Sequence, residues 1–402
     1  AAERTHCIAS LAKYWLLIVR AALVVAETPQ ALATLDDGWT ARSPSARLLV
    51  RSVAERLRAG LRTTTPVRIR APEIEHIIGA ILINSFGTRS ALGGAGRGAG
   101  EPLGVGLYVA AAMFQHSCAP NCEIDCTQPS PDADGTITFR TTQPIAAGAE
   151  VRICYIDAAE PTYVRRQLLW ASKRFVCGCS RCEDPTDGER FGGSFKCGAC
   201  GAGWQQPQGH GAGWACPACG GQTGAAAVWA WDAAWRDRLA ALDERAHSAG
   251  PSQELAGEYD ALIADALERC HPNHALLLSA RLAKVARALP AHSADVAAAR
   301  AKLFAAEAAL AQAVRILDPN DLQTADLHFQ IGAASFAIGA AAETPSGPRL
   351  DALKGAARHM LGSAQQFGAQ LGKDSKPAQA AHELAALAMR KLREVRRLKA
   401  DS

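Results

Sequence analysis

In the first part of the chain, apolar residues recur among polar ones at the spacing of an α-helix. Residues 1 to about 72 carry this spacing, and Pro44 favours the start of one of the helices. Pro72 interrupts the pattern, and a further helix is expected from Glu73 to Leu82. The sequence therefore predicts a helical region at the start of the chain.

The pattern then changes to short segments rich in β-forming residues. The glycine-rich stretch 91–100 is expected to be a loop, because glycine at that density holds neither a helix nor a strand. Turn residues such as 129–132 and Ala147-Gly148 separate the segments that follow. We expect small strands at 106–109, 123–126, 136–140 and 151–155.

Helical spacing returns from about residue 225 and continues to the end. The proline-containing segments 271–274, 318–320 and 375–377 each precede an amphipathic helix, and 343–348 is expected to be a loop. The interval is roughly fifty residues, longer than a standard tetratricopeptide unit but compatible with stacked helical hairpins. We expect an α-helical repeat domain here.

Composition and charge narrow the class of protein. Of 402 residues, 49% are hydrophobic and 20% are charged, which is typical of a folded protein with several domains. The net charge of +4 does not indicate a polyanion as partner. The apolar stretch 15–25 is too short to span a membrane and contains Arg20, so we expect a buried helix there. No signal peptide is evident, and the missing initiator methionine suggests a fragment or a processed form.

Cysteine spacing supplies the first chemical signal. The chain has 13 cysteines, and CxC and CxxC spacings gather several of them between Cys177 and Cys219. Without a secretion signal, reduced thiolates on a metal are favoured over disulfides, and the expected compartment is the cytoplasm or nucleus. Two CxxC pairs, Cys197/Cys200 and Cys216/Cys219, have the spacing of a zinc ribbon. Gly201 and Gly220 follow them and permit tight turns around the metal.

A second cysteine group is incomplete. Cys177, Cys179 and Cys182 supply three thiolates, whereas a closed structural zinc site takes four protein ligands. Spacing leaves the fourth ligand open among Cys118, Cys122, Cys126, Cys154 and a histidine such as His116.

An ordered set of motifs runs through the β-rich region. Ile83–Gly87 is followed by Gln115–Cys122 (QHSCAPNC), then by 143–157 and finally by 175–182 (FVCGCSRC). This order resembles the C-terminal half of a SET domain with its cysteine-rich post-SET segment. It is most similar to the SET-and-MYND (SMYD-like) subfamily of protein-lysine methyltransferases. The detailed resemblance covers about residues 75 to 225.

The resemblance implies transfer of a methyl group from S-adenosylmethionine to a lysine of a protein, histone or other. Such an amine must lose its proton first, because the pKa of lysine is about 10.4, and a narrow apolar channel favours that loss. By resemblance Tyr155 is the catalytic tyrosine that orients the amine and borders the cofactor. The other implied cofactor-binding residues are Asn84, Gln115, His116 and Phe175. Cys118 is implied as the fourth ligand of Cys177, Cys179 and Cys182, which leaves Cys122, Cys126 and Cys154 as core thiols.

Three positions or regions depart from the family pattern. Gln115 stands where the family has asparagine, and Lys173 occupies a position that is often tyrosine, which removes a possible channel aromatic. The N-terminal SET strands, their Gly-Arg-Gly cofactor loop and the MYND zinc ligands are absent. Thr5-His6-Cys7 is interpreted as the last turn of a MYND finger.

The fold class predicted is α+β, with a β-rich SET-type domain, two structural zinc sites and a tetratricopeptide-like helical domain. We assign 1–72 to a helical linker, 73–165 to the SET domain, 166–224 to the post-SET segment and zinc ribbon, and 225–402 to helical repeats. The predicted function is that of an S-adenosylmethionine-dependent protein-lysine methyltransferase. We expect a monomer without membrane contact whose helical domain binds protein partners.

Two other functions are compatible with parts of this sequence. A catalytically silent SET-fold scaffold would bind partner proteins through its helical region. A nucleic-acid-binding ribbon is disfavoured, because no Lys or Arg lies between its two cysteine pairs and only Lys196 lies beside them.

Overall fold

The computed structural model describes residues 2–90, 102–125, 127–128, 136–209, 213–290, 295–318 and 321–400. The chain forms two compact units. The first takes in Ala1–Gly93, Gly100–Asp157 and Val164–Cys179, and the second takes in Ala158–Tyr163 and Ser180–Ser402. The loop expected at 91–100, the turn expected at 129–132 and Cys126 lie outside the described residues.

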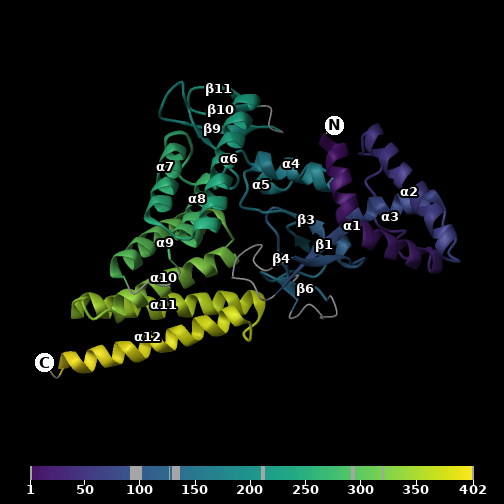
Figure 1. Cartoon of the computed structure of the whole chain (residues 1–402). Coiled ribbons are helices and arrows are strands. Elements are labelled where there is room, and N and C mark those ends of the chain that lie inside the picture. Colours follow the sequence, from purple (N-terminus) through teal and green to yellow (C-terminus); the bar gives the residue numbers. More distant parts are fainter. Residues whose placement is uncertain are drawn as a thin grey trace. The chain divides into compact units, whose positions relative to one another are not determined.

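Three helices open the first unit, and Figure 1 shows them in purple and dark blue. They are α1 (Ala2–Glu27), α2 (Pro44–Thr64) and α3 (Ala71–Asn84). The Oγ of Ser43 accepts a hydrogen bond from the Ala46 N–H at 3.3 Å, which caps α2 just before the proline that starts it. The predicted helix starts at Pro44 and near Pro72 are therefore confirmed.

The three helices share an apolar core rich in isoleucine. Ile18, Val50, Ile74, Ile77 and Ile78 are completely buried in it. Burying one such side chain contributes about 1.5–3 kcal/mol, so this core accounts for much of the packing of the helices.

The helix that contains 15–25 is buried along one side only. Ile18 and Ala22 are fully buried in the core, whereas Trp15, Leu16 and Val24 are exposed, so the expected burial holds for one face of the helix. No helix among the described residues has the length and apolar character required to cross a membrane.

Short strands follow, as predicted, but their bounds differ. They are β1 (Ser85–Ser90), β2 (Pro102–Leu107), β3 (Gln115–His116), β4 (Cys122–Asp125), β5 (Thr127–Gln128), β6 (Thr138–Thr141) and β7 (Arg152–Ile153). A 3-10 turn, η1 (Ala111–Met113), precedes β3. The sequence patterns missed β1, whose glycine and serine residues are poor strand formers, because pairing with β2 decides its conformation.

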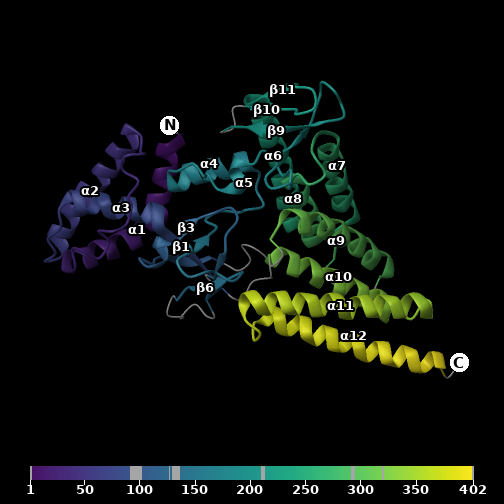
Figure 2. The same cartoon turned by 180° about the vertical axis from the view of Figure 1, so that it is seen from behind.

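These strands make three small sheets. One has the order β2-β1-β5, with β1 antiparallel to β2 and parallel to β5. In the others β4 pairs antiparallel with β6 and β3 pairs parallel with β7. The unit ends with helix α4 (Thr162–Lys173), whose residues from Val164 onwards belong to it and which buries Leu169. Figure 2 shows the strands and α1–α3 from behind.

The second unit begins with a short helix and a four-stranded sheet. Helix α5 (Ser180–Glu183) precedes β8 (Phe195–Lys196), β9 (Trp204–Gln208), β10 (Gly213–Ala215) and β11 (Gln222–Gly224). The sheet has the order β11-β10-β9-β8 with antiparallel pairs. Trp214 is 1% exposed, and its indole N–H donates to the Gly193 carbonyl at 2.8 Å. Its ring lies in the apolar core of this sheet, where it packs edge-on against Tyr163 and Phe195 at centroid distances of 5.0 and 5.9 Å. His210 lies outside the described residues.

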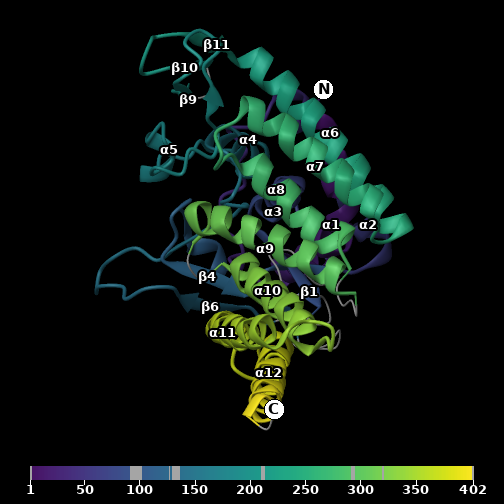
Figure 3. The same cartoon turned by 90° about the vertical axis from the view of Figure 1, so that its left-hand side faces the viewer.

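The remainder of the second unit is helical, which confirms the prediction from residue 225. The helices are α6 (Ala225–Ala249), α7 (Gln253–Arg269), α8 (Ala275–Ala283) with a π-helical turn at Lys284–Ala288, α9 (Val296–Ile316), α10 (Leu322–Ala340), α11 (Ser346–Leu371) and α12 (Lys376–Ala400). Side chains of Ser252, His274, Asp295 and Asp321 cap four of them. Within this unit the sheet lies at one end and α12 at the other (Figure 3).

Close packing joins the last helices. A methyl group built on Gly332 of α10 would lie 2.8 Å from Met360 Cγ of α11, so a larger residue at this position would push the helices apart. Helices α11 and α12 lie side by side (Figures 1 and 2). The loop expected at 343–348 ends earlier, because α11 begins at Ser346 and Pro348 fits its first turn. That these helices form tetratricopeptide-like repeats stays a prediction.

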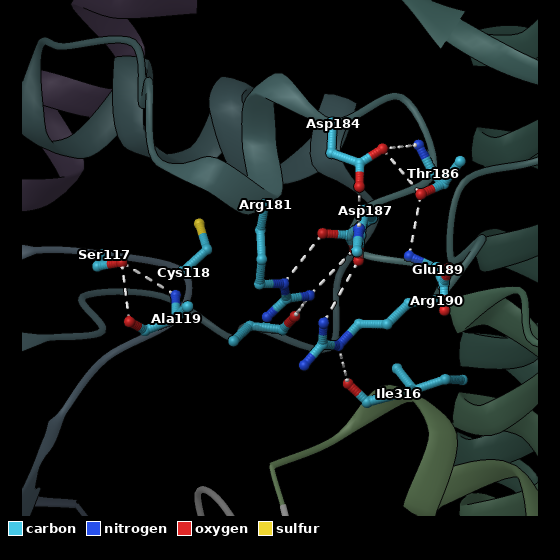
Figure 4. Close-up of polar contacts among 12 residues, drawn as sticks. Ser117, Cys118, Ala119, Arg181, Asp184, Thr186, Asp187, Glu189, Arg190 and Ile316 are labelled. Atoms are coloured by element: carbon cyan, nitrogen blue, oxygen red, sulfur yellow. Dashed lines mark hydrogen bonds and ion pairs between the residues drawn. The ribbon is translucent and has the colours of Figure 1, made fainter. Parts of the chain in front are cut away.

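A buried ion pair holds the turn that follows α5. The Arg181 guanidinium donates to both carboxylate oxygens of Asp187, at 3.0 Å each, and to the Ala158 carbonyl at 3.1 Å (Figure 4). Both side chains are only 6% exposed. Asp187 also adopts a left-handed backbone conformation, with a φ of 59°. The pair therefore fixes the turn directly beside Cys182.

We expect Asp187→Asn to lower the free energy of unfolding of this unit by about 3–5 kcal/mol, because it removes the negative charge that the buried Arg181 guanidinium meets at two hydrogen bonds. Asparagine keeps the shape of the aspartate side chain and tolerates the left-handed backbone conformation. The variant therefore differs from the unaltered chain in the charge alone. Urea unfolding followed by tryptophan fluorescence measures it. Asp351→Asn is the control, since that carboxylate pairs with Lys354 at 3.1 Å but is 78% exposed. Equal stability of the two variants would contradict this account.

Candidate functional site

One pocket of about 390 Å³ lies within the first unit. The end of α3, the start of β1, strand β3, the residues at and after β7 and the end of α4 contribute to its walls. The lining residues are Asp36, Ile83, Asn84, Ser85, Phe86, Gly87, Ala112, Gln115, His116, Ile124, Ile153, Cys154, Tyr155, Lys173 and Phe175. The structure therefore brings together all five predicted cofactor residues, Tyr155 among them, although their roles stay predictions.

Asn84 joins two parts of the pocket wall. Its side-chain amide donates to the Asp36 carbonyl at 2.8 Å and to the Ala80 carbonyl at 2.9 Å. The loop at Asp36 approaches α3 so closely that a methyl group on Gly79 would lie 2.6 Å from the Asp37 carbonyl oxygen. Asn84 thus holds this loop against the helix at the wall of the pocket.

Strand pairing sets the positions of Gln115 and His116. Gln115 pairs with Arg152 and His116 with Ile153 in a parallel arrangement. The amide of Asn121 strengthens it, because its Oδ1 accepts from the Arg152 N–H at 2.8 Å and its Nδ2 donates to the Glu150 carbonyl at 2.9 Å. The asparagine of the QHSCAPNC motif therefore has a structural role, whereas Gln115 is exposed at the pocket.

Three aromatic rings face one another in the pocket. The His116 ring centroid lies 5.2 Å from that of Tyr155 and 5.8 Å from that of Phe175, and the Tyr155 and Phe175 centroids are 6.4 Å apart. The Tyr155 hydroxyl donates to the Phe114 carbonyl. Burial raises the pKa of Tyr155, so its hydroxyl keeps its proton at neutral pH.

His116 connects this pocket with a cysteine. The Tyr155 backbone N–H donates to His116 Nδ1 at 3.1 Å, which requires a lone pair on that nitrogen. The ring therefore carries its hydrogen on Nε2, which lies 3.3 Å from Cys118 Sγ. An imidazole held at both nitrogens has one orientation, which is the arrangement expected beside a metal-bound sulfur.

The cysteines form two groups of four whose ligand atoms all lie within 4.8 Å of one another. The first group consists of Cys118, Cys177, Cys179 and Cys182. The second group consists of Cys197, Cys200, Cys216 and Cys219. The structure thus joins Cys118, among the five candidates, to the incomplete trio. All eight are free thiols.

Sulfur spacing fits zinc. A tetrahedron of thiolates at a Zn–S distance of 2.3 Å has edges of about 3.8 Å. The Sγ atoms of Cys197 and Cys219 are 3.6 Å apart, those of Cys200 and Cys216 3.9 Å, and those of Cys118 and Cys177 4.0 Å. Both groups can therefore hold zinc.

Backbone amides around the second group favour thiolates. The Gly203 N–H donates to Cys200 Sγ at 3.3 Å, and this bond, with that from Ala202, lowers the pKa of Cys200 to about 6. At Cys219 the Gly221 N–H acts in the same direction, but the neighbouring cysteines outweigh it and raise the pKa of that thiol. Gly201 and Gly220 have positive φ angles of 69° and 73°, as their places after the cysteine pairs predict.

Residues 80–156 match the SET domain family. The histone-lysine N-methyltransferase SMYD3 of Mus musculus is 36% identical over 83 residues, which are 21% of this chain and 18% of that protein. The SET domain-containing protein SmydA-8, isoform B, of Drosophila melanogaster is 31% identical over 114 residues, 28% of this chain and 23% of that protein. A SET and MYND domain-containing protein of Dictyostelium discoideum is 33% identical over 88 residues, with 21% and 20% covered.

The chain is a SET-domain protein. It is a distant and partial relative of the SET-and-MYND methyltransferases, since the matched stretches span about a fifth of the relatives' length. The predicted resemblance is thereby confirmed. The SET match includes Asn84, Gln115, His116 and Tyr155, whereas Phe175 lies beyond it and completes the pocket.

The SET-domain motifs did not predict that Asp36, Cys154 and Lys173 line the pocket. Asp36 comes from a loop before α2 that carries no motif, and its Oδ1 accepts from the Gly38 N–H at 2.8 Å. Cys154 lines the pocket and is half-buried rather than a core thiol as expected, whereas Cys122 is buried. Lys173 was recognised only as a departure from the family. The sequence held a signal for Lys173, because it stands at a position where the family often has a tyrosine of the channel.

Proposed function

We propose that this protein is an S-adenosylmethionine-dependent protein-lysine N-methyltransferase. The observation that carries the proposal is that Asn84, Gln115, His116, Tyr155 and Phe175, drawn from separate segments of a SET domain and its flank, surround one pocket. Two four-cysteine groups support it, because each has the ligand type and sulfur spacing of a structural zinc site.

The residues of the pocket suit the cofactor and the amine. S-adenosylmethionine supplies an electrophilic methyl group on a sulfonium. Amide and imidazole groups of Asn84, Gln115 and His116 offer hydrogen bonds to its polar parts, and the Phe175 ring offers an apolar face. The Tyr155 hydroxyl, fixed against the Phe114 carbonyl, presents an oxygen that orients an incoming amine. Tyr155 positions the amine and does not accept its proton, because its own pKa is raised by burial.

The apolar walls of the pocket favour the uncharged form of the substrate lysine. Ile83, Phe86, Ile124 and Ile153 line the pocket and disfavour an ammonium, so a target lysine loses its proton more readily there than in water. We propose a protein substrate, histone or other, and a cytoplasmic or nuclear location, where thiols stay reduced and hold zinc.

Methyl transfer from radiolabelled S-adenosylmethionine tests the proposal. We expect label on lysine when the complete gene product, loaded with zinc, is incubated with histones or a cell lysate. Calorimetry with S-adenosylmethionine in the absence of substrate separates binding from transfer. If neither transfer nor cofactor binding is seen, the enzyme proposal fails.

A silent scaffold is the second candidate, favoured by the surface of α9. Phe304 is 77% exposed and Val314 59% exposed on that helix, and a partner protein bound there would cover these apolar side chains. Cofactor binding discriminates the two functions, because a scaffold without methyl transfer has no need to hold S-adenosylmethionine.

A further inference from the structure

Lys173 places a positive charge inside the candidate cofactor pocket. It is the last residue of α4, and its ammonium donates to the Ile83 carbonyl near the end of α3. A carbonyl in the last turn of a helix has no partner within the helix and belongs to its negative end, so it suits a cation. The ammonium also lies 5.3 Å from the centroid of the Tyr155 ring. These contacts hold the charge beside the residue that we assign to the reaction.

The partners described for this ammonium are a carbonyl oxygen and an aromatic ring rather than a carboxylate. Within the described parts of the chain, no ion pair joins Lys173 to an acidic side chain. Asp36 is the acidic residue among those that line the pocket, and it is exposed. The other titratable groups that face the pocket are His116, Cys154 and Tyr155, and the walls formed by α3 and β1 contribute none.

We propose that the charge of Lys173 makes this pocket select against the sulfonium form of its cofactor. S-adenosylmethionine and its product S-adenosylhomocysteine differ by one methyl group and one positive charge. A fixed cation therefore weakens the binding of the methyl donor and leaves the binding of the neutral thioether product unaffected. This inference rests on the proposed function, and it makes Lys173 a residue that sets cofactor specificity.

The size of the pocket gives the magnitude. A ligand in a space of about 390 Å³ lies close to the ammonium wherever it binds. Two unit charges about 8 Å apart, at an effective dielectric constant of about 20, repel strongly enough to change a binding constant more than tenfold. We therefore expect at least a roughly tenfold preference for S-adenosylhomocysteine that is caused by this one side chain.

The preference depends on pH. Burial lowers the pKa of Lys173 to about 8, so the side chain is charged at pH 6.5 and largely uncharged at pH 9.5. The affinity for S-adenosylmethionine is expected to rise relative to that for S-adenosylhomocysteine as the pH increases through this value. At low pH the pocket would retain the product.

Calorimetry with the two ligands tests the inference without any measurement of activity. Dissociation constants are determined at pH 6.5, 7.5, 8.5 and 9.5 for the full chain, for Lys173→Met and for Lys173→Tyr. We expect the ratio of the two constants to change about tenfold with pH in the unaltered chain and to vary little in both variants. Lys354→Met removes an exposed lysine of the other unit and is expected to behave like the unaltered chain.

The possible outcomes separate the two proposals. If both ligands bind but their ratio is the same with and without Lys173, the selection by charge is refuted and the cofactor pocket stands. An equal loss of affinity for both ligands in Lys173→Met also refutes the selection by charge, because Lys173 would then pair with the carboxylate that the two ligands share. If no form of the chain binds either ligand, the cofactor pocket itself is refuted. The pH series on the unaltered chain decides the question even if a variant does not fold.

Discussion

Removal of zinc is expected to unfold the sheet β8–β11 and to release two metal ions per chain. The strands of this sheet are two to five residues long, and its apolar core is a small cluster of aromatic rings in which Trp214 packs on Phe195 and on Tyr163. The two cysteine turns contact each other through their sulfur atoms, and a methyl group on Gly203 would lie 2.5 Å from Cys216 Sγ. Zinc binding to small domains of this kind contributes about 10–16 kcal/mol, far more than so small a core.

A strong chelator and a cysteine variant measure this dependence. Atomic emission is expected to find two zinc ions per purified chain and one in Cys216→Ser. After chelation, Trp214 becomes exposed to water, and its fluorescence should shift to longer wavelength. Protease cleavage should then appear between Cys197 and Gly224.

Cys270→Ala is the matched control. Cys270 is a buried thiol that belongs to neither group of four, so its variant should keep both zinc ions. A sheet that remains protected from protease without metal, or a chain that carries no zinc when purified under reducing conditions, would contradict the assignment.

The change Tyr155→Phe is expected to lower the rate of methyl transfer about a hundredfold or more. The phenylalanine ring keeps the contacts with His116 and Phe175 but lacks the hydroxyl that orients the amine. Loss of one such positioned group in an active site typically costs 10²–10³-fold in kcat. Because the hydroxyl stays protonated and does not act as the base, the pH dependence of the remaining activity should be unchanged.

Tyr14→Phe serves as the comparison, since Tyr14 packs against the α1–α3 core and does not line the pocket. The affinity for S-adenosylhomocysteine should be similar in both variants and in the unaltered chain. Full activity of Tyr155→Phe, or an equal fall in both tyrosine variants, would remove the catalytic role from Tyr155.

Local motifs predicted the parts of the site that local chemistry defines. Two CxxC pairs can meet around a metal because each is a short turn, so Cys197 to Cys219 were found from spacing alone. The Cys118 ligand needed a family resemblance, because nothing local joins residue 118 to residues 177–182. The cofactor residues were found in the same way.

Other parts depend on packing between distant segments, which no local pattern encodes. Asp36 enters the pocket because Gly79 lets its loop approach α3. Lys173 finds its partner in the carbonyl of Ile83, a backbone atom without a sequence signature. The short strands were recognised but their ends were not, because pairing with neighbours fixes where each begins.

The dispersed origin of the pocket has a consequence for synthesis of the chain. Its walls come from Asp36, the end of α3, β3, the residues at β7 and the end of α4, so the pocket is complete only after Phe175 has left the ribosome. Helices α1–α3 pack mainly on one another and can form first, whereas long-range contacts of this kind form late. Until then the apolar side chains of Ile83, Phe86 and Ile153 have no opposite wall. The nascent chain would therefore expose Ile83 and Phe86 to chaperones while the roughly ninety residues that follow them are translated, and Ile153 for a shorter time.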